Sequence, residues 1–173
     1  MLKMQTVTLV KVMAVHGTGV APVGFVDVQP MVNQMTGDRV AVPHGTIYGL
    51  PYVRLQGGAN AVICDPAPGD IGLCAFASRD ISSVKSNKAV SNPGSQRTFD
   101  WADGIYLGGC LNISPTQYLL LDGSGITLHS GVAVTVSAPH VTIGNATTID
   151  GKVFLNHTHG GVQTGSGTTG PVS

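Results

Sequence analysis

Two histidines near the end of the chain, His157 and His159, are the residues best suited to bind a metal. They follow Val153 and Leu155 at every second position, so in an extended strand all four side chains point to the same side. If three chains share an axis on that side, six imidazoles converge on one point. Neutral imidazole binds iron, zinc, copper and nickel, and six equivalent ligands suit an octahedral ion. Zinc prefers four ligands, so the pattern favours iron, as Fe²⁺, with one ion for three chains.

A His-x-His pair in a lone chain is a weak indication of a metal, because the spacing also occurs by chance. The apolar row before it strengthens the interpretation, since buried imidazoles are costly to desolvate unless their nitrogens have partners. A bound ion would also stabilise the chain ends that it joins. The stretch 160–173 is rich in Gly, Thr and Ser, and it is expected either to fray or to fold back as a cap. We therefore assign 157–173 to a metal-binding apex.

The segment that must position this pair, 111–156, alternates apolar residues with Thr and Ser between frequent turns. Its apolar rows are Ile126 and Leu128; Val132, Val134 and Val136; Val141 and Ile143; and Val153 and Leu155. So short a stretch of strands cannot bury these rows alone. Three copies wound about a common axis would bury them and leave no open sheet edge. The sequence thus predicts a trimeric, intertwined triple-stranded β-helix, whereas a left-handed hexapeptide solenoid would need a six-residue apolar period that is not found here.

Residues 1–95 are typical of a small all-β domain. Strands are expected at 6–12, 24–30, 47–55, 59–64 and 71–77, with turns at 36–38, 56–58 and 68–70. Five short strands fit an OB-fold barrel, and a β-sandwich is the alternative. Residues 78–88 are expected to hold a helical turn, with Arg79 and Asp80 available for a local salt bridge. Residues 96–110, which carry Phe99, Trp101 and Tyr106, are expected to form a connecting arm.

The composition excludes several classes of protein. The chain has 173 residues, with 9 Lys and Arg, 9 acidic residues that are all Asp, and a net charge of zero. The lack of Glu argues against a helical bundle, and 24 Gly residues favour strands and tight turns. Without a basic run, direct nucleic-acid binding is not expected. Only three charged residues follow Cys110, namely Asp122, Asp150 and Lys152, which indicates a domain boundary near that cysteine.

The cysteines and the N-terminus bear on the compartment. Cys64, Cys74 and Cys110 cannot all pair within one chain, and apolar neighbours favour buried free thiols made in a reducing cytosol. No continuous apolar run precedes Lys11, so no signal peptide is predicted. No stretch approaches the ~20 apolar residues of a membrane-spanning helix.

No catalytic motif is found, so the sequence predicts no enzyme. It has no Gly-x-Ser-x-Gly elbow, phosphate-binding glycine loop or His-Glu-x-x-His, and no Glu for a glycosidase pair. Two alternatives stay open: a trimeric metalloenzyme in which His157 and His159 hold a metal with open positions, and a carbohydrate-binding adhesin. An adhesin would need exposed aromatic residues in the second part, which has only Tyr118 and Phe154. The other histidines are expected at the surface or in local hydrogen bonds: His16, His44, His129 and His140.

Three stretches also carry a family resemblance: 26–30 (VDVQP), 68–80 (PGDIGLCAFASRD) and 157–161 (HTHGG). They resemble an early barrel strand, a later strand with its turn, and the iron-binding tip of the membrane-puncturing central spike of contractile-tailed phage baseplates. With the layout between them, the resemblance covers nearly the whole chain. It implies a homotrimer with an N-terminal OB-fold, a C-terminal β-helix and an apex closed by iron on His157 and His159 of each chain.

The resemblance also implies a place and a task. Spikes of this family sit at the baseplate tip of the virion tail, where the N-terminal domain is expected to contact the hub and tail tube proteins. Sheath contraction drives them through the host outer membrane, a transient contact. The chain is then expected to be made in the host cytoplasm. Its β-helix is short, which implies a short needle, and no lysozyme-like insertion is found.

Overall fold

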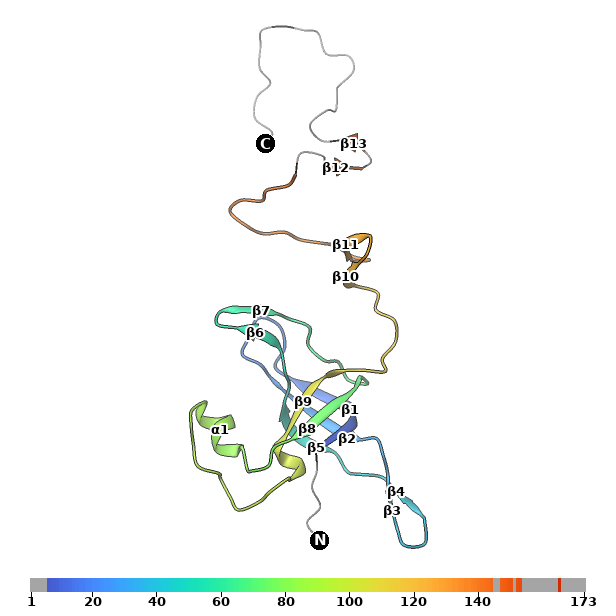
Figure 1. Ribbon diagram of the computed structural model, residues 1–173, viewed down its shortest axis with the longest axis vertical. Coiled ribbons are helices and arrows are strands. Elements are labelled where there is room, and N and C mark those ends of the chain that lie inside the picture. Colours follow the sequence, from blue (N-terminus) through green and yellow to red (C-terminus); the bar gives the residue numbers. More distant parts are fainter. Residues whose placement is uncertain (1–5, 145–146, 151, 154–164, 166–173) are drawn as a thin grey trace. The chain divides into compact units, whose positions relative to one another are not determined.

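The computed structural model describes residues 6–144, 147–150, 152–153 and 165 (Figure 1). Two compact units divide the chain, unit 1 from Met1 to Ser114 and unit 2 from Pro115 to Ser173. Strands dominate the described part, in which α1 (Ser82–Asn87) and the single 3-10 turn η1 (Trp101–Asp103) are the helical elements. The expectation of a mostly β protein is therefore confirmed.

Unit 1 is built around one five-stranded sheet in the order β5-β2-β1-β8-β9. Its strands are β1 (Val7–His16), β2 (Phe25–Pro30), β5 (Ile47–Pro51), β8 (Ile71–Phe76) and β9 (Gly104–Gly109). All four neighbouring pairs are antiparallel. A parallel bridge between Tyr52 and Tyr106 joins the two edges, with the Val53 N–H donating to the Tyr106 carbonyl over 2.8 Å. The sheet therefore curls until the end of β5 meets β9.

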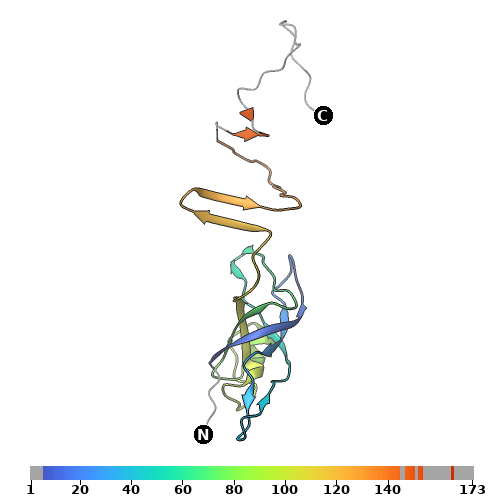
Figure 2. The same ribbon diagram turned by 90° about the vertical axis from the view of Figure 1, so that its right-hand side faces the viewer.

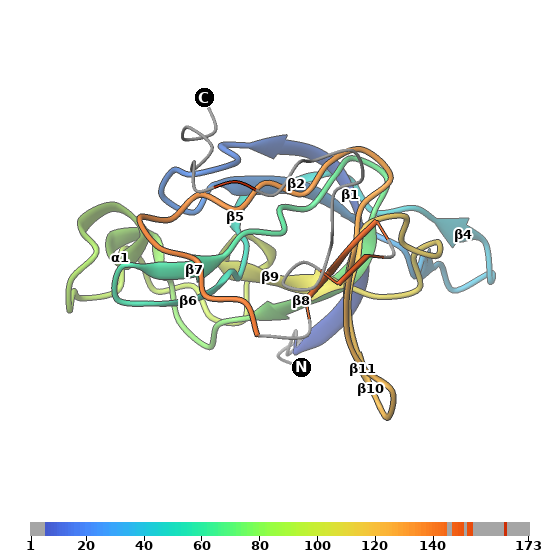
Figure 3. The same cartoon turned by 90° about the horizontal axis from the view of Figure 1, so that it is seen from above.

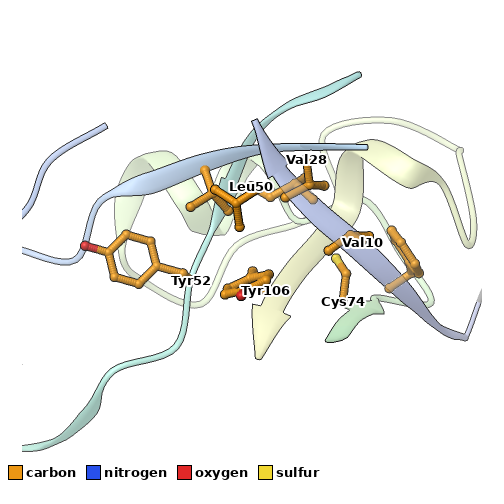
Figure 4. Packing of buried hydrophobic residues seen from close by; sticks show 9 residues of the cluster. Val10, Val28, Leu50, Tyr52, Cys74 and Tyr106 are labelled. Atoms are coloured by element: carbon orange, nitrogen blue, oxygen red, sulfur yellow. The ribbon is translucent and has the colours of Figure 1, made fainter. Parts of the chain in front are cut away.

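The core of unit 1 consists largely of residues at alternate positions along these strands. In β2, Val26 and Val28 are buried while Asp27 between them is half-buried, because successive side chains point to opposite faces of a strand. Val10 and Val12 follow the same rule in β1. Figure 4 shows Val10 and Val28 together with labelled core residues from other strands of the sheet. The remaining buried apolar residues are Leu50, Tyr52, Cys74, Phe76 and Tyr106.

Most strands of unit 1 lie where the alternation predicts them. Residues 6–12, 24–30 and 71–77 correspond to β1, β2 and β8, and 47–55 contains β5. The predicted strand at 59–64 is shorter, and it forms a hairpin of β6 (Leu55–Gly57) with β7 (Asn60–Val62) outside the main sheet. A second hairpin, β3 (Gln34–Met35) with β4 (Ala41–Val42), surrounds the predicted turn at 36–38. The two hairpins project on opposite sides of unit 1 (Figure 1, Figure 3).

The segment 96–110, expected as a connecting arm, contains the fifth strand of the sheet. β9 pairs with β8, and unit 1 continues to Ser114. Alternation did not indicate this strand because three of its six residues are glycine. Gly72 on β8 makes room for the strand, since a Cβ there would collide with the Tyr106 hydroxyl and the Gly108 carbonyl. Glycine allows β8 and β9 to approach each other closely. It also removes the alternation of apolar and polar residues by which a strand is predicted from sequence.

The helical turn expected within 78–88 is confirmed as α1, but the salt bridge expected beside it is wrong. Asp80 pairs with Arg97, with 2.9 Å between Nη2 and Oδ1, whereas Arg79 is exposed. The reason is geometric: Asp80 is buried and Arg79 points to solvent, so the adjacent residues do not meet.

The strands described in unit 2 differ in position from those that the alternation predicts. β10 (Tyr118–Asp122) and β11 (Gly125–His129) form an antiparallel hairpin, orange in Figure 2, and β12 (Thr148–Ile149) pairs with β13 (Lys152–Val153). The strand with Ile126 and Leu128 is thus confirmed as β11. The strands expected at 132–136 and 141–143 are absent from the single chain. A strand needs a neighbour for its backbone hydrogen bonds, and this stretch has none within the described chain.

Candidate functional site

The predicted metal ligands His157 and His159 lie outside the described residues. So does Leu155, while Val153 ends β13. Within the part of the chain that the structure describes, no three His, Cys, Asp or Glu side chains gather where a metal could bind. None of the helices described there is long and apolar enough to cross a membrane. The candidate functional site that can be described is the apolar surface upstream of the histidines.

The β10–β11 hairpin carries four aliphatic side chains on one face. In its register Leu119 lies opposite Leu128 and Leu121 lies opposite Ile126, and paired residues of an antiparallel ladder share a face. The four side chains are 60%, 62%, 66% and 74% exposed, in the order Leu119, Leu128, Leu121 and Ile126. We call these four residues the assembly face.

The opposite face of the hairpin is mixed in character. Tyr118 stacks on His129, with 4.9 Å between ring centroids and 22° between planes, and Leu120 lies opposite Thr127. The two faces differ because alternate positions along each strand carry different kinds of side chain, and alternate side chains point to opposite faces. The hairpin is therefore amphipathic, and its apolar side is the assembly face.

Apolar exposure continues beyond the hairpin. No residue of 115–144 or 147–150 is buried. Six further aliphatic residues are each more than half exposed: Val132, Val134, Val136, Val141, Ile143 and Ile149. Monomeric soluble proteins rarely expose contiguous apolar patches of more than a few hundred Å². The described part of unit 2 thus contains no core in a single copy, in contrast to unit 1.

Unit 1 holds an ion-pair network in which the partly exposed Arg97 binds two buried carboxylates. The guanidinium donates to Asp103 through Nε (2.7 Å, to Oδ2) and Nη2 (2.8 Å, to Oδ1), and to Asp80 through Nη2 (2.9 Å). The carboxylate side chains are 0% and 1% exposed for Asp103 and Asp80. Hydrogen bonds from Ser82 and Ser95, with the charge of Arg97, lower the pKa of Asp80 to about 2. The hydrogen bond from Arg97 lowers the pKa of Asp103 as well.

A second network holds the loop between β1 and β2. Asp65 accepts hydrogen bonds from the Gly19 N–H (2.6 Å), the Tyr52 hydroxyl (2.9 Å) and Arg54 Nη2 (2.5 Å). Arg54 Nη1 also donates to the Ala21 carbonyl over 2.9 Å. The Gly19 bond is the largest cause of the lowered pKa of Asp65. Both networks join residues far apart in the sequence, so no local motif indicated them.

The remaining histidines lie mostly at the surface, as predicted. His16, His129 and His140 are exposed, and His16 Nε2 lies 2.9 Å from Asp27 Oδ2. His44 is half-buried and faces the ring of Trp101, with 5.1 Å between centroids.

The cysteines are free, as predicted, but their burial differs from the prediction. Cys74 is buried in the core, where desolvation raises its pKa to about 12. Cys64 is exposed and Cys110 is half-buried. Cys64 escapes burial because it follows β7, whose hairpin lies outside the main sheet.

Comparison with known proteins adds no family assignment. No protein-family model matches the chain, and no curated protein sequence matches it.

Proposed function

We propose that this chain is a non-enzymatic structural protein, the central spike at the baseplate tip of a contractile phage tail. In this proposal three identical chains form one spike, and iron bound at its apex stiffens the tip that pierces the host outer membrane. The observation that carries the proposal is the exposed assembly face of β10–β11, together with the exposed aliphatic residues that follow it.

The assembly face supports association of identical chains. Each copy presents the same row of Leu and Ile side chains, and closed cyclic symmetry lets equivalent rows meet around one axis. Burying one such side chain contributes about 1.5–3 kcal/mol, so four per chain are a substantial driving force. An intertwined triple-stranded β-helix buries these rows, and it gives residues 131–144 the strand neighbours that the single chain lacks.

The strand order of unit 1 supports an OB-fold barrel over a β-sandwich. A sandwich consists of two sheets packed face to face, whereas here five strands follow one another in one sheet whose edges meet through the Tyr52–Tyr106 bridge. In the proposal this domain contacts the hub and tail tube proteins.

His157 and His159 would hold the apical iron. The donor set fits the ion, because three chains provide six neutral imidazoles and no anionic ligand, which suits octahedral coordination. The bound ion would supply a cross-link between three chain ends. In an extended strand His157 and His159 would continue the row of Val153 and Leu155, so the metal would follow directly after the proposed apolar core.

The proposed mechanism is mechanical. A wound trimer distributes compressive load over many backbone hydrogen bonds, and a closed cross-section leaves few backbone groups unpaired in hydrocarbon. Unit 2 has few charged residues, which lowers the cost of passage through lipid without providing a strong reason to remain there.

The proposal is tested by measuring the mass of the purified full chain in solution together with its metal content. We expect a trimer with one iron for every three chains. A stable, monodisperse monomer would contradict the assembly, and about one ion per chain would favour a metalloenzyme instead.

A further inference from the structure

The loop of residues 81–102 leaves the sheet after β8 and returns at β9, and Trp101 is its one residue packed against the core cluster. It contains α1, which has no buried residue, and no residue of the loop is buried. Val84 is 45% exposed and Val90 is fully exposed. Figure 1 shows the loop projecting beside the sheet.

The base of the loop is held by polar contacts. Asp80 precedes the loop and Asp103 follows it, both are buried, and Arg97 from within the loop binds both carboxylates. Ser95 Oγ donates to Asp80 over 2.7 Å, and the Ile81 N–H donates to Asp103 over 3.0 Å.

Two contacts place the ends of the loop next to the sheet. The Ala77 N–H donates to the Asp103 carbonyl over 3.0 Å, so the chain leaves and returns at adjacent points. Trp101 packs its ring edge-on against Phe76, with 4.9 Å between centroids. The loop is therefore attached near its two ends, and its middle rests on polar contacts.

This arrangement separates the stability of the loop from that of the sheet. Regions with few buried apolar contacts open locally at a lower free energy than the core of the same domain. When the loop opens, the ionic groups at its base become hydrated. No residue of 81–100 takes part in the backbone pairing of the five strands. Without Arg97, the buried carboxylates of Asp80 and Asp103 would have no cationic partner. An unpaired buried charge is strongly destabilising, so the closed state of the loop would lose stability.

We propose that residues 81–100 of the loop open and close as one unit, held closed by Arg97, while the five strands stay paired and Trp101 stays packed against Phe76. Opening exchanges the Arg97 contacts with Asp80 and Asp103 for water. The loop is thus a conformational device of unit 1, and this inference does not depend on the proposed spike function.

Hydrogen exchange of the full-length protein at low urea concentrations tests the opening itself. The Ile81 amide donates to Asp103 at the base of the loop, and the amides of Lys85 and Lys88 donate to the Ile81 and Val84 carbonyls within α1. A helix of six residues is not stable once it is detached from the domain, so all three amides report opening. We expect them to exchange at least tenfold faster than the paired amides of β1 and β2, with a rate that is independent of urea. Equal exchange of loop and strands, with the same dependence on urea, would overturn the proposal.

Substitutions then test the latch. Arg97→Gln should raise exchange of the three loop amides at least tenfold further and leave β1 and β2 unchanged. Arg79→Gln is the matched control, because Arg79 is exposed in the same connection, and it should change neither. If Arg97→Gln fails to fold, Ser95→Ala removes a single contact with Asp80 and should raise loop exchange alone. An equal rise in the loop and in the strands would show that the network stabilises the whole domain instead.

Discussion

At the scale of single residues, charge in unit 1 is used to join distant parts of the chain. Arg97 binds carboxylates from two ends of one loop, and Asp65 holds the β1–β2 loop through Gly19 and Arg54. Each of these carboxylates accepts several hydrogen bonds, which stabilise its ionised form. The same groups therefore determine how the domain responds to acid.

Acid should destabilise unit 1 over a defined pH range. The pKa of Asp80 in the folded chain is about 2, below the unfolded value of about 3.9. A lowered pKa contributes stability that is complete above the unfolded value and is lost as pH falls towards the folded value. We expect the free energy of unfolding, measured by urea titration, to fall between about pH 4 and pH 2. Asp80→Asn should flatten this dependence, and an unchanged slope in that variant would contradict the assignment.

At the scale of elements, the two units use the same β pattern differently. In β1 and β2 the apolar residues of one parity are buried by the closed sheet. In β10 and β11 the corresponding residues form the assembly face and remain exposed. Alternation of apolar and polar residues predicts a strand with one apolar side. Whether that side is buried depends on another strand or chain that packs against it.

A charge on the assembly face should therefore impair association. Leu121→Asp replaces a side chain proposed to be buried among three chains by a carboxylate, which is costly to desolvate without a partner. We expect at least a tenfold rise in the monomer fraction at micromolar concentration, measured by sedimentation velocity.

The matched control lies on the other face of the same hairpin. Thr127→Asp introduces the same charge opposite Leu120, and it should leave the oligomer unchanged. Dissociation by both variants, or by neither, would contradict the role of the assembly face.

At the scale of the whole molecule, unit 1 has a core and unit 2, as a single chain, has no buried residue in its described part. Isolated two-stranded hairpins are marginally stable in water. Assembly of identical chains is the proposed source of the missing burial, with the metal as an addition at the end of the row.

Removal of the metal ligands should separate these two contributions. His157→Ala with His159→Ala is expected to abolish iron binding and to lower the thermal midpoint of unfolding, because a ligand of the folded state no longer stabilises it. The trimer should persist, since the apolar rows precede the histidines. Elemental analysis and solution mass of the double variant check both statements. Its dissociation into monomers would show that the metal, rather than the assembly face, holds the chains together.

Much of the fold follows from local pattern, and the exceptions share a physical cause. β2 could be predicted because Val26 and Val28 alternate with polar residues, and the turns at 36–38 and 68–70 because glycine marks them. β9 could not, because its glycines conceal the alternation. The strands expected at 132–136 and 141–143 have the pattern without a partner in the single chain. Of the candidate site, His157 and His159 stay predictions, and the row that leads to them is described only as far as Val153.

The sequence by itself determined the mostly β class and the apolar row of Ile126 and Leu128, because parity and hydropathy are properties of neighbouring residues. The structure added Leu119 and Leu121, which the register of β10 with β11 places on the same face. Only the tertiary structure decided that Arg97, rather than Arg79, pairs with Asp80, and that β9 meets the end of β5. Those contacts join residues far apart along the chain, and their partners are chosen by how the sheet closes.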